Sequence, residues 1–70
     1  MPAASQFSLT SFIVDVDFFC DDERYGTETY TITAASRYQA EQDALQRSGS
    51  SIYDDDRIPD RRRRANAREA

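Results

Sequence analysis

Histidine and lysine are both absent from this sequence of 70 residues, so every basic side chain is an arginine. Histidine is the commonest general base and metal ligand in proteins, and its absence removes most routes to acid–base or nucleophilic catalysis. The sequence also lacks a Gly-rich phosphate-binding loop, a C-x-x-C pair and the ligand spacing of a calcium-binding loop. We therefore predict that the protein is not an enzyme and holds neither a metal nor a cofactor.

Cysteine and long apolar runs are also scarce. Cys20 is the only cysteine, so an internal disulfide is impossible and a reducing compartment fits best. No apolar run approaches the roughly 18 residues that span a membrane. The first residues lack the basic start and apolar core of a signal peptide. We expect a soluble protein of the cytoplasm with no membrane partner.

The strongest signal in what is present is the stretch Phe12–Cys20. Its residues alternate between an apolar set and a set that contains Asp15 and Asp17, which is typical of a half-buried strand. We predict a strand from Thr10 to Cys20. Ile13 and Phe19 place apolar side chains on the aspartate face, where they are either covered by other segments or exposed as part of a binding surface.

A second strand is predicted for Thr27–Ala34, with four threonines on one face and Tyr30 and Ile32 on the other. The charged segment between the strands, residues 21–26, reads as a hairpin loop. We expect Gly26 at its end to supply the positive φ that hairpin connections often need.

A helix follows the hairpin. Ser36 and Gln39 have the spacing of a capping box, which predicts a helix over Arg37–Ser48 with a narrow, alanine-rich apolar stripe. The next residues, Ser50–Tyr53, form either a brief third strand or a return loop that lodges Ile52 against the core.

The charge of the chain is divided between its two parts. Residues 1–56 carry a net charge of −8 and residues 57–70 a net charge of +4. Four adjacent arginines would oppose the dipole of a helix and repel one another, so we expect the tail to be mobile or partly helical. The predicted fold is α+β: a two- or three-stranded antiparallel sheet with one helix packed on it (ββα or ββαβ), formed by residues 1–56, and a flexible basic tail over 57–70.

Two groups of residues are candidates for function. The first is a carboxylate-rich surface on one side of the hairpin, with aromatic residues as anchors, which would dock on a basic protein partner. Its predicted members are Asp15, Asp17, Phe19, Asp21, Asp22, Glu23, Tyr25 and Glu28. The plain alternative is a solvated strand face and loop.

The second candidate is the arginine run of the tail, which could neutralise phosphates of a nucleic acid. Its members are Arg61, Arg62, Arg63 and Arg64. The run contains no aromatic residue on which bases could stack. Folding back on the acidic body, plain solvation and a protein partner remain alternatives for this segment.

A short acidic chain with only arginine as its base and a ββα layout over Phe12–Ser48 resembles the small accessory proteins of bacteriophages, of the anti-CRISPR inhibitor kind. The resemblance implies action without catalysis, in the host cytoplasm, by occupying the basic nucleic-acid groove of a host complex or blocking a moving part. The run Arg61–Arg64 departs from a purely acidic mimic. We therefore expect a protein-binding inhibitor of a nucleic-acid-handling complex, with nucleic-acid binding through the tail as the alternative; the oligomeric state is left open.

Overall fold

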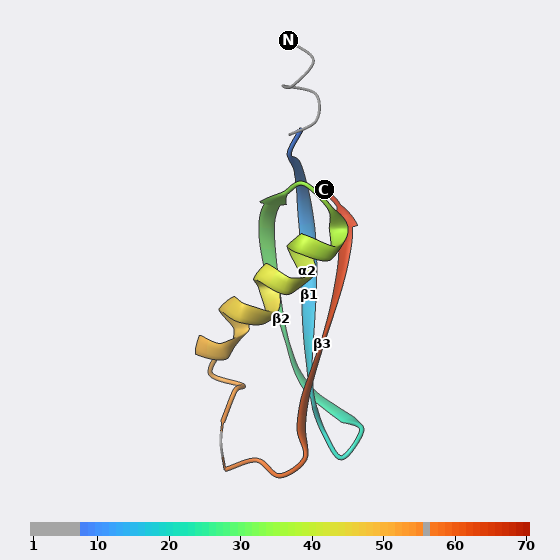
Figure 1. Cartoon of the computed structure of the whole chain (residues 1–70). Helices are drawn as coiled ribbons and strands as arrows, with labels where there is room; N and C mark the ends of the chain where they lie inside the picture. The colour runs from blue at the N-terminus through green and yellow to red at the C-terminus, as the bar shows by residue number, and fades with distance from the viewer. Residues whose placement is uncertain (1–7, 56) are drawn as a thin grey trace.

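The sheet of this protein has three antiparallel strands, and one helix lies across one of its faces (Figure 1). The computed structural model describes residues 8–55 and 57–70. The elements are β1 (Thr10–Cys20), β2 (Glu23–Ala34), α2 (Arg37–Arg47), the short 3-10 helix η1 (Ser48–Ser50) and β3 (Arg61–Glu69). The strand order is β2-β1-β3, so the first strand is central. The predicted α+β class, with three antiparallel strands and one helix, is confirmed.

The core lies between the helix and the face of β1 that alternation marks as apolar. Cross-strand neighbours share a face of a sheet, and Phe12 is opposite Ile32 in the β1–β2 register. The buried residues of the helix, Ala40 and Ala44, are small, and Leu45 packs partly buried against the same core. The buried apolar residues are Phe12, Val14, Val16, Phe18, Ile32, Ala34, Ala40 and Ala44.

The hairpin turn is tighter than the sequence predicts. Only Asp21 and Asp22 lie between β1 and β2, and both have a positive φ, 51° and 66°. Two consecutive positive φ values are the mark of a type I′ hairpin turn, and aspartate tolerates this region better than most residues. The expectation for Gly26 is wrong, since neither glycine has a positive φ. Gly26 lies within β2, next to a register shift opposite Phe18 and Phe19.

Gly26 instead makes room for an aromatic ring. A Cβ atom there would lie 2.5 Å from Cδ1 of Tyr53, whose ring packs on Phe18 with the centroids 5.4 Å apart. The ring therefore cannot withdraw without disturbing the core.

Gly26→Ala is expected to destabilise the fold by about 1–3 kcal/mol, the usual cost of overpacking. Chemical denaturation measures the loss. Gly49→Ala is the matched control, because a Cβ at Gly49 would meet no atom closer than 3.8 Å and should change stability by less than about 0.5 kcal/mol. Equal losses in both variants would contradict the steric explanation.

The helix begins as the capping box predicts. Ser36 is the N-cap, and its Oγ accepts a hydrogen bond from the backbone N–H of Gln39 at 3.2 Å. The Gln39 side chain reaches back and accepts from the N–H of Ala35 at 3.3 Å, one residue before the usual position. Among the described residues, no helix is both long and apolar enough to cross a membrane.

The tail is the main correction to the prediction. Residues 61–69 are neither mobile nor helical: they form β3, which pairs antiparallel with β1 from Phe12 opposite Glu69 to Cys20 opposite Arg61. Of the alternatives left open for the tail, fold-back on the body is the one observed. β3 belongs to the same sheet as the hairpin, so the predicted division after residue 56 does not hold. Residues 1–7 and Asp56 of the predicted domain lie outside the described residues.

The physical reason is that a strand separates the arginines better than a helix does. Successive strand residues project to opposite faces, so neighbouring arginines point apart. Ala65 and Ala67 alternate with polar residues and pack, partly buried, against the core. β1 also offers β3 a full row of backbone partners, which a solvated helix would not supply.

The segment Ser50–Tyr53 is not a strand. Ser50 ends η1 and residues 51–53 form a turn, and Ile52 is 86% exposed rather than lodged in the core. Tyr53 takes the place expected for Ile52: its ring packs against those of Phe18 and Tyr25, with the centroids 5.4 and 6.2 Å away. The third strand therefore comes from the arginine-rich segment, after a connection that runs from the end of η1 to the hairpin end of the sheet (Figure 1).

Candidate functional site

The face of the sheet opposite the helix is the candidate site. We call it the open face, because no element in residues 8–55 and 57–70 covers it. Its β2 and β3 side chains are all exposed, and the β1 side chains between them are partly buried by these neighbours. The pairing registers place on this face Ile13, Asp15, Asp17 and Phe19 of β1, Arg24, Thr27, Thr29, Thr31 and Thr33 of β2, and Arg62, Arg64, Asn66 and Arg68 of β3.

The aspartates of the open face already have partners within the protein. Asp15 accepts hydrogen bonds from Arg68 at 2.7 Å and from Thr29 at 2.8 Å, and these bonds lower the pKa of its carboxyl group. Asp17 accepts from Thr27 at 2.8 Å and lies 3.7 Å from the guanidinium of Arg24.

The charge of the open face is therefore the reverse of the prediction. Four arginines and two aspartates give the face a net charge of +2. The remaining described residues carry ten acidic and five arginine side chains, a net charge of −5. The protein has one weakly basic face on an otherwise acidic molecule. Sequence reasoning missed this because it placed the aspartates correctly but left their neighbours on β3 unknown.

The eight predicted partner-binding residues do not share one surface. Asp15, Asp17 and Phe19 lie on the open face, Asp21 and Asp22 form the turn, and the exposed Glu23 begins β2. The remaining two belong to the helix side of the sheet.

Tyr25 and Glu28 are both engaged on that helix side. The Tyr25 hydroxyl donates a hydrogen bond to the backbone oxygen of Tyr53 at 2.6 Å, and burial raises the pKa of this hydroxyl. Glu28 accepts a hydrogen bond from Ser51 at 2.9 Å. The expectation that all the hairpin carboxylates lie on one side is therefore wrong for Glu28, and Tyr25 is not a free anchor.

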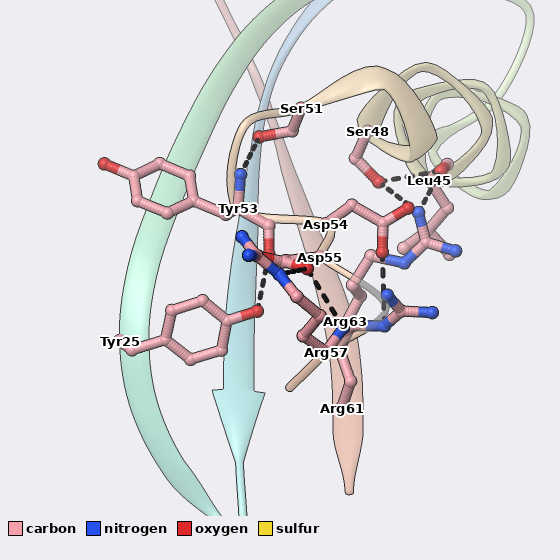
Figure 2. A network of polar contacts seen from close by, with 10 residues as sticks. All are labelled: Tyr25, Leu45, Ser48, Ser51, Tyr53, Asp54, Asp55, Arg57, Arg61 and Arg63. Atoms are coloured by element: carbon pink, nitrogen blue, oxygen red, sulfur yellow. Dashed lines mark hydrogen bonds and ion pairs between the residues drawn. The ribbon is translucent and has the colours of Figure 1, made fainter. Parts of the chain in front are cut away.

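The arginine run is divided between the two faces. Figure 2 shows the helix-side pair: Arg63 donates to the oxygen of Leu45 at 3.1 Å and to Ser48 Oγ at 2.8 Å, and Arg61 lies 3.3 Å from Asp54. A cation at the last carbonyls of a helix offsets the negative end of its dipole, so Arg63 has a structural role. Arg61 and Arg63 are therefore committed to the fold.

The other two arginines of the run face outward. Arg62 is paired with Asp22 of the turn. Arg64 has no carboxylate partner among the described residues; its guanidinium lies over the Phe19 ring, 5.7 Å from the centroid. Phe19, Asp22, Arg62, Arg63 and Arg64 line a hollow of about 330 Å³.

Two carboxyl groups should make the protein less stable in acid. The Arg57 side chain, with its backbone N–H, lowers the pKa of Asp55 to about 2, and Arg68 lowers the pKa of Asp15. Both groups bind protons less readily than in an unfolded chain, where the aspartate pKa is about 3.9. Their stabilising effect is therefore complete above about pH 4 and is lost as the pH falls toward about 2.

NMR titration of the side-chain carboxyl signals tests this. Midpoints for Asp15 and Asp55 below the unfolded value are expected, whereas Asp21 should titrate above it. A hydrogen bond with Asp60 and the repulsion between the two carboxylates raise the pKa of Asp21. Coincident midpoints for the three groups would contradict the contacts described.

Several residues of the open face were not predicted as site residues. They include Arg24 and Asn66. The alternation of Ala65 and Ala67 with polar residues was the available signal, and it is short. No group of three acidic or cysteine side chains in residues 8–55 and 57–70 is arranged to hold a metal ion.

The open face thus combines a row of arginines, a row of hydroxyl groups and one aromatic ring on a rigid sheet. Such a surface can bind anions and flat rings. Comparison of the chain with protein-family models, with curated proteins and with solved structures gives no match, so a proposal for its function rests on this geometry.

Proposed function

We propose that the protein binds nucleic acid, without catalysis, through its open face. The observation that supports this most strongly is the row formed by Arg62, Arg64 and Arg68 on one strand. Alternate strand residues are about 6.6 Å apart, so Arg62 and Arg64 are separated by one such step and Arg64 and Arg68 by two, which offers a line of cations to a chain of phosphates. This is the arginine-tail alternative with one change: the arginines are held on a strand instead of a mobile tail.

The net charge of −4 for the whole chain does not oppose this proposal. Binding depends on the local potential, and the charge of the open face is +2 while the rest of the described chain carries −5. The acidic helix side would repel a polyanion and leave the open face as the approach. Arg64 and Asn66 extend into solvent between the ion-paired arginines, which supplies donors for phosphate oxygens.

Two double variants with equal loss of charge test the proposal. Arg62→Gln with Arg64→Gln should weaken binding to a labelled DNA oligonucleotide. The slope of log affinity against log salt concentration should fall by about 1 to 2, because up to two phosphate contacts are lost. Arg37→Gln with Arg47→Gln removes the same charge from the exposed side of α2 and is the matched control. Fluorescence anisotropy over a series of salt concentrations gives both quantities. Equal losses in the two variants, or no binding by the original protein at low salt, would refute the proposal.

A gain of affinity provides an independent test. Asp15→Asn keeps an oxygen for the Thr29 hydroxyl but removes the charge that pairs with Arg68. The freed guanidinium should raise affinity and increase the salt slope by about 1. Unchanged affinity would mean that Arg68 does not contact the nucleic acid.

A second candidate function is favoured by the carboxylates at the hairpin end of the sheet. A hydrogen bond with Asp60 and the repulsion between the two carboxylates raise the pKa of Asp21, and Asp22 follows Asp21 in the turn. A lysine or arginine of a partner would relieve this crowding. We propose, as the second candidate, an inhibitor that docks this end on a basic, nucleic-acid-handling protein.

Asp21→Asn with Asp60→Asn tests the second candidate, because asparagine also accepts the positive φ of both sites. Quantitative affinity purification from a nuclease-treated bacterial lysate should show a basic protein retained by the original bait and lost by the variant. Equal retention would exclude this mode. DNA binding by the open face should be unaffected.

A further inference from the structure

We propose that the nucleic acid bound by the open face is single-stranded, with one base stacked on Phe19. This rests on the proposed function and adds to it the class of ligand. The inference comes from the position of the Phe19 ring relative to the arginine row.

Phe19 is an aromatic residue that the core does not use. Its neighbour Phe18 fills the core on the helix side, whereas Phe19 projects to the open face and lies outside the core cluster. Its ring lines the hollow of about 330 Å³ together with Asp22 and the outward-facing Arg62 and Arg64. A flat apolar surface bordered by cations matches a nucleotide, which joins a flat ring to an anion.

A base can replace the Arg64 guanidinium that lies over the Phe19 ring. The guanidinium of Arg64 lies 5.7 Å from the centroid of the Phe19 ring and has no carboxylate partner among the described residues. Arg64 can therefore turn to a phosphate, or stack on the outer side of the base, without breaking an ion pair. Stacking of a base on an aromatic ring is stronger than an exposed cation–π contact, so the exchange is favourable.

The order of the β-strands in the sheet fits a single-stranded nucleic acid that lies along β3. Phe19 is directly opposite Arg62 in the β1–β3 register, so the ring is one strand spacing, about 4.8 Å, inward from the arginine row. Phosphates on the row would place a base over β1. Asp15 and Asp17 occupy the next positions of β1 and would repel a backbone that shifted toward the centre of the sheet.

A duplex cannot use this arrangement. Its bases are stacked on one another and present only their edges in the grooves, so the face of the Phe19 ring has no partner in paired DNA. The proposal therefore makes a specific claim: the arginines act on any nucleic acid, and Phe19 acts only on unpaired bases.

The test compares a short labelled DNA oligonucleotide with its duplex, using the original protein, Phe19→Leu and the Arg62→Gln, Arg64→Gln double variant. Leucine keeps the apolar bulk of the site without an aromatic face. We expect the original protein to prefer the single strand, and Phe19→Leu to lose about tenfold in single-strand affinity with unchanged duplex affinity and salt slope. The double arginine variant should weaken binding to both.

A ring-proton measurement keeps the proposal testable if Phe19→Leu does not fold. In the original protein, the NMR signals of the Phe19 ring should shift upfield on addition of the single strand and not on addition of the duplex. Equal affinity for the two DNA forms, unchanged single-strand affinity in Phe19→Leu, or an unmoved ring signal would overturn stacking while leaving arginine-dependent binding intact. Binding of neither DNA form by the original protein would overturn the proposed function and this inference together.

Discussion

The Phe18→Ala variant is expected to be largely unfolded at room temperature. Phe18 is fully buried, and its ring packs against those of Tyr25 and Tyr53, with centroids 6.3 and 5.4 Å away. Truncating a buried phenylalanine costs about 3–5 kcal/mol. A single core of this size rarely supplies more than about 3–5 kcal/mol in total, so the loss is comparable with the whole stability. Thermal melting followed by circular dichroism measures the outcome.

The adjacent residue provides the control. Phe19→Ala removes a ring of the same size from the open face, where it contacts Arg64 and not the core. We expect a loss of about 1 kcal/mol or less and a cooperative melt. Equal destabilisation by the two substitutions would mean that the two faces of β1 are not divided as described.

The second large effect is expected from removal of β3. A chain that stops at Asp60 should lose its cooperative fold, because β1 would become an edge strand in a two-stranded sheet that is only marginally stable in water. The truncation also removes Ala65 and Ala67 from the core margin and takes away the arginine that binds the carbonyl of Leu45. Amide signals collapsed into the random-coil range would show the unfolding.

The Arg62→Gln, Arg64→Gln double variant separates the strand from its charge. It keeps the nine-residue length of β3 and both inward alanines, so it should melt cooperatively near the original temperature. A truncated chain that melts like the original protein would show that β3 adds nothing to the fold. Unfolding of the double variant would show that ion pairs on the open face, rather than strand pairing, hold β3 in place.

The hairpin and helix were predictable because their signals are local. Alternation over Phe12–Cys20 and Thr27–Ala34 gives two strands and their inward faces, and Ser36 with Gln39 marks the start of the helix. These signals follow from the twofold repeat of a strand and from the unpaired N–H groups of a helix start. Each can be recognised without knowledge of the rest of the chain.

The third strand was not predictable in the same way. Arginine, alanine and asparagine have little preference for strands, and the segment is a strand because β1 offers it an unpaired edge. This is a property of the assembled hairpin and helix. Within the segment itself, the four adjacent arginines are only unfavourable for the start of a helix. Their separation onto two faces of a sheet depends on pairing with β1, which lies far away in the sequence.

The site followed the same pattern. Asp15, Asp17 and Phe19 were correctly expected on the outer side of β1, but the character of that side depends on the neighbouring strand. A register that sets Arg68 beside Ile13 also brings its guanidinium to Asp15, and an expected acidic surface becomes a basic one. The sign of a surface is thus decided by pairing register, which no single stretch of sequence contains.

The strand order has a consequence for synthesis of the protein on the ribosome. The central strand β1 emerges before both of its neighbours, and β3, which pairs with its second edge from Phe12 opposite Glu69, emerges after β2 and α2. Until residues 61–69 have left the exit tunnel, a nascent hairpin displays one bare edge of β1 that any passing strand could join. Pairing across almost the whole described chain is also slow to form. Asp15 and Asp17 lie along that waiting edge, and their attraction for an arginine-rich segment gives the correct strand an advantage over neutral or acidic competitors.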